Sequence, residues 1–320
     1  RTLWLTAVVY TLSGLGFALS TAEAAWIWTP KLGKWINPKN AAKDSAEQQF
    51  DHAFQLYQRD AYAKAMKEFQ KLVAKWPASL RAPEAQFYSG LCLQKLGKYY
   101  ASFKAYEKVL QKYPYGEQLH LVVERIFEVA EIFREGAKLE IKEKYLTIVP
   151  SKEKAAEMYL SVVKYAPYDP LADKAQYRAG LCYGEVNNHT KAHKIFKSFL
   201  QDYPESPLVA EVELRLAQSS QAQSLDSAYD QSATQVALEQ YEQILEDHDE
   251  PIMQEQAQEA LDALREKAAE KEYKVAEFYE KKKEYSSAVI YYETILSDYS
   301  DTSFANLASD RLDWIRLHHP

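Results

Sequence analysis

Two histidines of this chain have a spacing that could serve a metal ion. His189 and His193 lie four positions apart, so a helix would present both imidazoles on one face. Two histidines alone hold zinc poorly, and no third ligand lies near them in the sequence, so we expect ordinary helix residues. The sequence also contains no nucleophile elbow, phosphate loop, zincin motif or compact pair of acids. We therefore expect neither catalysis nor a metal or cofactor.

The two cysteines are the remaining reactive side chains. Cys92 and Cys182 each end a Gly-Leu-Cys triplet, and both occupy the same position of a longer repeat. Equivalent positions two repeat units apart should be separated by far more than the 7 Å or so that a disulfide tolerates. We predict two free, buried thiols.

The repeat that carries these residues runs through most of the chain. Each unit has a small residue, an aromatic or equivalent residue four positions later, and a helix stop eight positions after that. The six sets are Ala65, Phe69 and Pro77; Ser102, Tyr106 and Pro114; Ala155, Tyr159 and Pro167; Ala192, Phe196 and Pro204; Ala237, Tyr241 and Asp249; and Ala288, Tyr292 and Ser300. A period near 40 residues with abundant helix formers is typical of stacked helical hairpins. The sequence predicts an all-α tetratricopeptide-repeat superhelix, or α-solenoid.

The repeat also predicts where the hairpins lie and how closely their helices approach. Counting back from each set places a small residue in four of the first helices, at Ala53, Gly90, Gly180 and Ala276. The expected hairpins are residues 45–79, 82–116, 117–169, 170–206, 207–250 and 251–302, followed by an end helix at 304–317. Polar insertions are expected at 134–150 and 219–232. Residues from about 253 to 283 are expected to form one long helix or two nearly continuous ones.

The amino-terminal residues differ from the solenoid, which we expect to span 45–320. Residues 1–24 form an apolar stretch ending in small residues, which predicts a secretory signal or, alternatively, an uncleaved anchor. Residues 25–44 hold three Trp and two Pro within a short span, which predicts an extended segment rather than a helix. This segment could cap the first hairpin or dock on a partner or a membrane interface.

The charge balance bears on the class of partner. The chain carries 39 Lys and Arg against 46 Asp and Glu, a formal net charge of −7. From this value we expect no basic patch and therefore no nucleic-acid binding.

The carboxyl-terminal residues resemble a known family. Residues 264–279, 285–289 and 296–302 are similar to the last repeat of the BamD family, tetratricopeptide lipoproteins of the machinery that inserts β-barrels into the bacterial outer membrane. We expect the close match to cover about the last 90 residues. The family's lipid-accepting cysteine has no counterpart after the predicted cut, so the Trp/Pro segment is the expected alternative tether.

The resemblance implies a periplasmic, outer-membrane-associated scaffold. Its expected partners are a BamA-like insertase, other subunits of the assembly complex and unfolded barrel proteins. The expected partner interface lies in residues 257–279 and the end helix, with Arg265, Lys267, Lys271, Tyr273 and Trp314 as its residues. The alternative is a periplasmic adaptor for cell-wall, pilus or secretion machinery, which would use the same surface on other ligands.

A peptide groove is the second site that the pattern favours. The first helices of hairpins line the concave face of such solenoids. The positions expected to face it are Phe50, Phe54, Tyr57, Phe87, Leu91, Tyr177 and Leu181. This aromatic strip suits an extended peptide with an aromatic end, although the same pattern also fits packing between hairpins.

Overall fold

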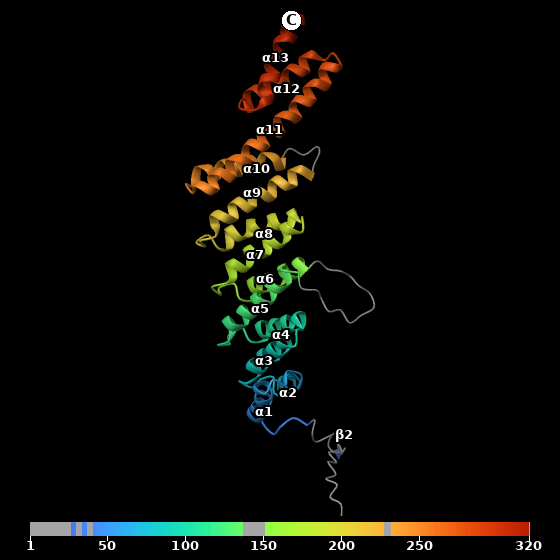
Figure 1. Cartoon of the computed structure of the whole chain (residues 1–320), viewed down its shortest axis with the longest axis vertical. Helices are drawn as coiled ribbons and strands as arrows, with labels where there is room; N and C mark the ends of the chain where they lie inside the picture. The colour runs from blue at the N-terminus through green and yellow to red at the C-terminus, as the bar shows by residue number, and fades with distance from the viewer. Residues whose placement is uncertain are drawn as a thin grey trace, which may run out of the picture.

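A computed structural model of the chain describes residues 27–29, 34–36, 41–114, 116–136, 151–226 and 232–319. Thirteen helices within these residues stack along one axis and form an elongated rod, with the amino-terminal helices at one end and the carboxyl terminus at the other (Figure 1). Successive helices contact each other along the whole rod. The predicted all-α tetratricopeptide-repeat solenoid is confirmed.

The helices pair as antiparallel hairpins. The first four pairs are α1 (Ala46–Gln58) with α2 (Tyr62–Lys75), α3 (Ala82–Lys95) with α4 (Tyr99–Lys112), α5 (Leu119–Arg134) with α6 (Ser151–Tyr165), and α7 (Ala172–Glu185) with α8 (His189–Asp202). They are followed by α9 (Val209–Asp226), α10 (Ser232–Asp247), α11 (Pro251–Lys281), α12 (Tyr285–Asp298) and α13 (Ser303–His318).

The turns inside most hairpins share one backbone conformation. The second residue after the first helix has a positive φ in five hairpins: Asp60, Gly97, Gly136, Asn187 and Lys283. This left-handed conformation ends a helix and releases the chain for the return helix. Gly, Asn and Asp adopt it readily, whereas Lys283, with φ 63°, does so at a steric cost.

The small residues mark the closest contacts between paired helices, as predicted. A Cβ atom on Gly90 would lie 2.3 Å from Cε1 of Tyr106, and one on Gly180 would lie 2.4 Å from Cε1 of Phe196. Ala53 and Ala276 are fully buried at the corresponding positions. The ring of the second helix therefore occupies the space that a side chain on the first helix would need.

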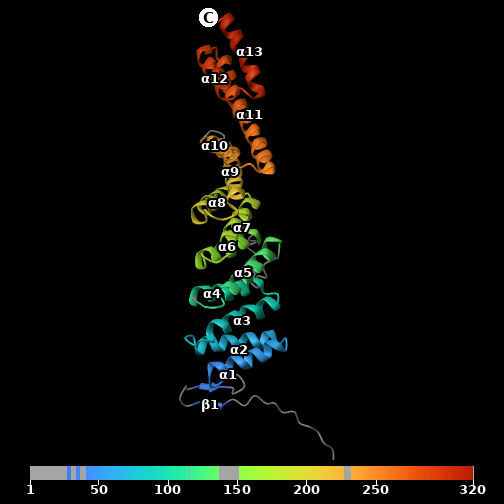
Figure 2. The ribbon, with the colours of Figure 1, turned by 90° about the vertical axis from the view of Figure 1, so that its left-hand side faces the viewer.

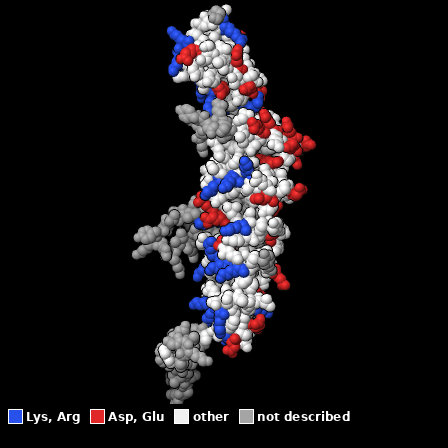
Figure 3. All heavy atoms as spheres, turned by 180° about the vertical axis from the view of Figure 1, so that it is seen from behind, with Lys and Arg blue, Asp and Glu red and all other residues white. Residues whose placement is uncertain are grey.

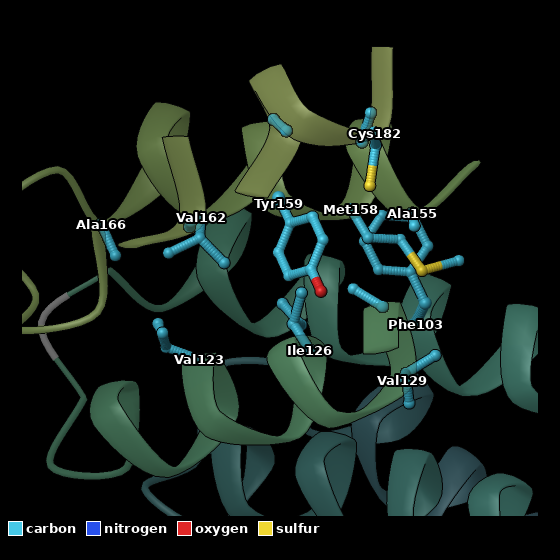
Figure 4. Packing of buried hydrophobic residues seen from close by; sticks show 14 of the residues in the cluster. Phe103, Val123, Ile126, Val129, Ala155, Met158, Tyr159, Val162, Ala166 and Cys182 are labelled. Atoms are coloured by element: carbon cyan, nitrogen blue, oxygen red, sulfur yellow. The ribbon is translucent and has the colours of Figure 1, made fainter. Parts of the chain in front are cut away.

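The repeated aromatic residue fills each layer of the core. Tyr106, Tyr159, Tyr241 and Tyr292 are all fully buried. Three of these phenols donate a hydrogen bond at the margin of the core, for example from Tyr106 Oη to Gln94 Oε1 at 2.8 Å. Figure 4 shows Tyr159 packed between Ile126 and Cys182. Tyrosine suits this position because its ring packs while its hydroxyl reaches a polar partner.

The cysteines confirm the predicted register. Cys92 and Cys182 are free and fully buried. Burial in these layers raises the pKa of each thiol to about 12. Both therefore act as small apolar core residues.

The long helix α11 joins the last two hairpins. Its first half, with Ala257, Leu261 and Leu264, packs in one core with α9 and α10, whereas Ala269 and Ala276 pack in a separate core with α12 and α13. Figure 2 shows α11 running between these two groups of helices. The expected assignment of 251–302 to one hairpin is therefore too simple, because α11 serves two layers.

The extended amino-terminal segment is confirmed where it is described, whereas the insertion predicted at 219–232 is partly helical. β1 (Ile27–Thr29) and β2 (Lys34–Ile36) pair antiparallel, with Trp28 opposite Trp35, so these residues are extended as expected. Residues 219–226 do not form an insertion loop but continue α9, where Ser219 and Ser220 are buried. The predicted signal at 1–24, the remainder of 25–40 and the insertion residues 137–150 lie outside the described residues. None of the described helices combines the length and apolarity needed to cross a membrane.

Candidate protein-interaction surfaces

The amino-terminal aromatic residues form one cluster, but its members differ in accessibility. Phe54 and Tyr57 of α1 are half-buried, and each ring centroid lies 5.2 Å from that of Tyr88 on α3. Phe50 is only 5% exposed and packs against Phe69 in the core. The surface of this cluster is therefore made by Phe54, Tyr57 and Tyr88, because Phe50 has little area to offer a ligand.

Tyr88 is the residue that the sequence analysis missed. The repeat count selected its neighbour Phe87, which the structure instead buries to 7% exposure against Tyr106. Two adjacent aromatic residues lie about 100° apart on a helix, so only one can face the preceding hairpin. The spacing of Phe50, Phe54 and Tyr57 does not indicate which of the two aromatic residues of α3 contacts them.

The remaining positions of the predicted groove lie farther along the rod. Leu91, Tyr177 and Leu181 are half-buried and pack against the central core. Tyr177 Oη donates to Glu211 Oε1 at 3.0 Å, so its polar end is held by α9. Leu181 lines a cavity of about 310 Å³ between α7, α8 and α9, where the missing side chain of Gly184 leaves open space.

The two histidines do not meet at a common site. His189 lines the cavity at hairpin four, whereas Nδ1 of His193 lies 3.1 Å from Ser220 Oγ on α9. Burial lowers the pKa of His193, which favours the neutral imidazole in this contact. Within the described part of the chain no group of three or more His, Cys, Asp or Glu residues could hold a metal ion.

A second cavity lies at the turn edge of hairpins three and four. It has a volume of about 680 Å³ and is lined by residues of the two helix-stop turns, including Tyr168, Asp169 and Glu205, and by Asp173 in the first turn of α7. Asp169 is already bound by His120 Nδ1 at 3.0 Å, and Asp173 accepts a hydrogen bond from Ser206 Oγ at 2.6 Å. These acids therefore serve the contact between hairpins.

At the carboxyl-terminal end, Arg265 is engaged within the protein. Its guanidinium donates three hydrogen bonds to the Asp301 carboxylate, of 2.7, 2.9 and 3.1 Å, and a fourth to the carbonyl oxygen of Asp298. It therefore fastens α11 to the turn between α12 and α13. Arg265 was expected to be available to a partner, but this clamp uses its hydrogen-bonding groups.

Tyr273 and Trp314 have different surroundings. The Tyr273 ring packs on Tyr292 and Phe304 and is half-buried. Trp314 is 38% exposed and lies over the guanidinium of Arg311, which is paired with Glu280. Tyr273 thus contributes mainly to the last core, whereas Trp314 presents part of its ring to solvent.

Two lysines of the predicted interface make no ion pair within 4.0 Å among the described residues. Lys267 is exposed and Lys271 is half-buried on α11. Their ammonium groups are therefore available for an external acidic partner.

The last three helices also expose several large apolar side chains. Their exposed fractions are 52% for Phe278, 63% for Ile290, 46% for Leu307, 38% for Trp314 and 77% for Leu317. Leu307 and Trp314 are seven positions apart and so share one face of α13, with Leu317 close to it. This spacing was visible in the sequence and could have extended the predicted interface beyond Trp314. Exposed apolar side chains rimmed by charges are typical of protein contacts.

Comparison with known proteins places most of these surfaces within a family. The model of a family described as YfiO, outer membrane lipoprotein, matches residues 128–312. A tetratricopeptide-repeat model matches residues 84–114. The family match is wider than the roughly 90 carboxyl-terminal residues expected from the sequence, because it begins within α5 of hairpin three and continues through hairpin six.

Three similar solved structures share less than 20% sequence identity with this chain. A tetratricopeptide-repeat protein of Thermus thermophilus is 18% identical, with a TM-score of 0.31, 68% of this chain and 99% of that chain covered. One from Parabacteroides merdae is 14% identical, with a TM-score of 0.32 and coverages of 85% and 98%. MamA from Desulfovibrio magneticus is 17% identical, with a TM-score of 0.30 and coverages of 64% and 96%. No curated protein matches the sequence.

Proposed function

Because the chain belongs to the YfiO family of outer membrane lipoproteins, we propose that it is a non-enzymatic periplasmic scaffold of an outer-membrane β-barrel assembly machinery. Its fold is that of a protein-interaction module, since stacked hairpins offer an extended surface. The observation that carries the proposal is the match over residues 128–312, which includes α11, α12 and most of α13. Phe278, Ile290 and Leu307 lie within the match, whereas Trp314 and Leu317 lie just beyond it.

We assign the contact with a BamA-like insertase to the carboxyl-terminal surface. Trp314, Leu317 and Leu307 supply apolar area on α13, and Lys267 and Lys271 supply unpaired positive charge on α11. A central apolar anchor with flanking charges is the usual composition of an interface hot spot. Arg265 and Tyr273 support this surface from within, because both hold α11 against the turn and helix that follow α12.

The test is capture of the insertase's periplasmic domain by the full chain in detergent. Trp314→Ala combined with Leu317→Ser should weaken capture at least tenfold, as expected for loss of about 2 kcal/mol at an apolar anchor. Leu80→Ser is a matched control, because Leu80 is 95% exposed at the other end of the rod. Equal capture by both variants would refute the assignment, and co-purification with cell-wall, pilus or secretion components instead would favour the alternative adaptor role.

We propose that unfolded barrel proteins bind the amino-terminal cluster of Phe54, Tyr57 and Tyr88. This cluster lies outside the residues that match the family, so its support is the accessible aromatic surface itself. Phe54→Ala should reduce binding of a labelled peptide with an aromatic carboxyl end, whereas Tyr291→Ala, a half-buried aromatic residue near the far end of the rod, should not. A version starting at Asn40 shows whether the Trp/Pro segment covers the cluster or contributes to it. Negligible binding by every version would exclude the cluster as a substrate site.

A further inference from the structure

Charge is strongly segregated along the rod. Residues 59–112 contain 11 Lys and Arg against four Asp and Glu, whereas residues 216–264 contain 11 Asp and Glu and no Lys or Arg. Figure 3 shows basic groups on the amino-terminal half and again at the carboxyl-terminal end, with a dense acidic group over hairpin five between them. The net charge of −7 conceals this distribution, so the expectation that no basic patch exists is wrong.

The basic residues of the first two hairpins gather on the return helices α2 and α4. Each helix buries its opposite face, with Phe69 and Leu72 on α2 and Tyr106 and Val109 on α4. α3 packs against both helices and so holds them in adjacent layers. The exposed lysines of this face are Lys64, Lys67, Lys75, Lys104, Lys108 and Lys112.

Most of this positive charge is not neutralised by the protein. Lys104 pairs with Glu107 at 2.8 Å. In the described residues, Lys64, Lys67, Lys108 and Lys112 have no acidic partner within 4.0 Å. An array of uncompensated charges on adjacent helices repels itself, and an external anionic surface would relieve that repulsion.

We infer that the lysine face of α2 and α4 docks on a bilayer surface that contains anionic lipid headgroups. All seven basic residues of these two helices are lysines, which act as mobile point charges and do not need the fixed geometry of a bidentate site. The lysines project from helix surfaces, and both cavities described above lie elsewhere, against α6–α9. An extended anionic surface therefore fits this face better than a compact anion does.

A nucleic acid is the other extended polyanion that could bind this lysine face. Family membership favours the bilayer. The chain belongs to a family of outer membrane lipoproteins, so a bilayer lies within reach of the folded protein. A lysine near an anionic bilayer strengthens binding by roughly fivefold. The inference does not depend on which protein partners the scaffold binds.

The test is co-sedimentation of the full chain with vesicles of phosphatidylcholine, with or without roughly one-third phosphatidylglycerol. The measured quantity is the ratio of binding to anionic and neutral vesicles, because an apolar amino-terminal segment would bind both alike. The wild-type ratio should be high and should fall as salt is added. Substituting Gln for Lys64, Lys67, Lys108 and Lys112 should lower the ratio by more than about tenfold.

A matched variant tests whether the effect is specific to this face or follows from the loss of any four exposed lysines. Gln at Lys164, Lys191, Lys194 and Lys197 also removes four exposed lysines, but from residues 151–226, where nine basic residues face ten acidic ones. This variant should keep the ratio within about threefold of wild type. An equal loss in both variants, a wild-type ratio near one, or binding to duplex DNA without binding to anionic vesicles would overturn the inference. Circular dichroism of both variants verifies folding.

Discussion

Gly180→Ala is the sharpest test of the hairpin register, because the structure places a ring where the new methyl group must go. The added Cβ would lie 2.4, 2.7 and 2.8 Å from three carbons of the Phe196 ring, distances that require movement. Phe196 is only 3% exposed and cannot turn away freely. Overpacking of this kind costs about 1–3 kcal/mol, while replacing Gly by Ala within a helix gains up to about 1 kcal/mol. The net expectation is a loss of about 1–2 kcal/mol.

The same helix supplies the control. At Gly184 no atom lies within 4 Å of the position that an added methyl group would occupy, so Gly184→Ala should be neutral or stabilise the protein by up to about 1 kcal/mol. Urea unfolding followed by circular dichroism compares the midpoints of the two variants with wild type. Adding Phe196→Leu to Gly180→Ala should recover part of the loss, because the shorter side chain vacates the contact. A stabilising Gly180→Ala, or equal effects of the two alanines, would refute the packing argument.

The other predictions concern the ion pair of Arg265 with Asp301 and the thiols of the two cysteines. Arg265→Glu should destabilise the last hairpin by about 1 kcal/mol, the value for a partly exposed ion pair, whereas Lys267→Glu should stay within about 0.5 kcal/mol in the same urea assay. Because Arg265 lowers the pKa of Asp301 from its ordinary 3.8, the pair stabilises the fold above that pH and loses its effect as the pH falls through the lowered pKa. The deficit of Arg265→Gln should therefore shrink in acid, and a deficit that does not change with pH would mean that Asp301 is not the partner. Cys92 and Cys182 should resist thiol reagents in the native protein and give two thiols per chain after unfolding, whereas loss of titratable thiol in a monomer would contradict the separated layers.

Much of the fold could be read from the residues, because each hairpin is specified locally. The aromatic ring and the small residue that receives it both lie within one hairpin, as Gly180 and Phe196 show. The sequence therefore sufficed for the hairpin register and the buried cysteines, and it left one long helix or two nearly continuous ones for residues 253–283. It did not suffice for residues 219–226, whose polar composition suggested a loop although the helix buries two serines against its neighbours.

The sites were harder to predict from the sequence, because they depend on contacts between hairpins. Phe87 and Tyr88 are equally aromatic in the sequence, and only the packing of α3 on α1 decides that Tyr88 meets Phe54 and Tyr57. Arg265 is a charged residue of the kind expected at a free surface, yet it forms a hydrogen-bonded ion pair with Asp301, 36 positions later.

Repeat period, helix stops and small-residue positions were thus determined by the sequence alone, since they express local propensities and contacts within a hairpin. The tertiary structure decided which side chains remain available to partners. It also decided where the charge gathers, because stacking brings the lysines of α2 and α4 into adjacent layers and leaves the acidic residues of hairpin five elsewhere on the rod. Which side chains a partner can reach, and where charge accumulates on the surface, both depend on the relative placement of distant segments. A linear sequence does not contain that placement explicitly.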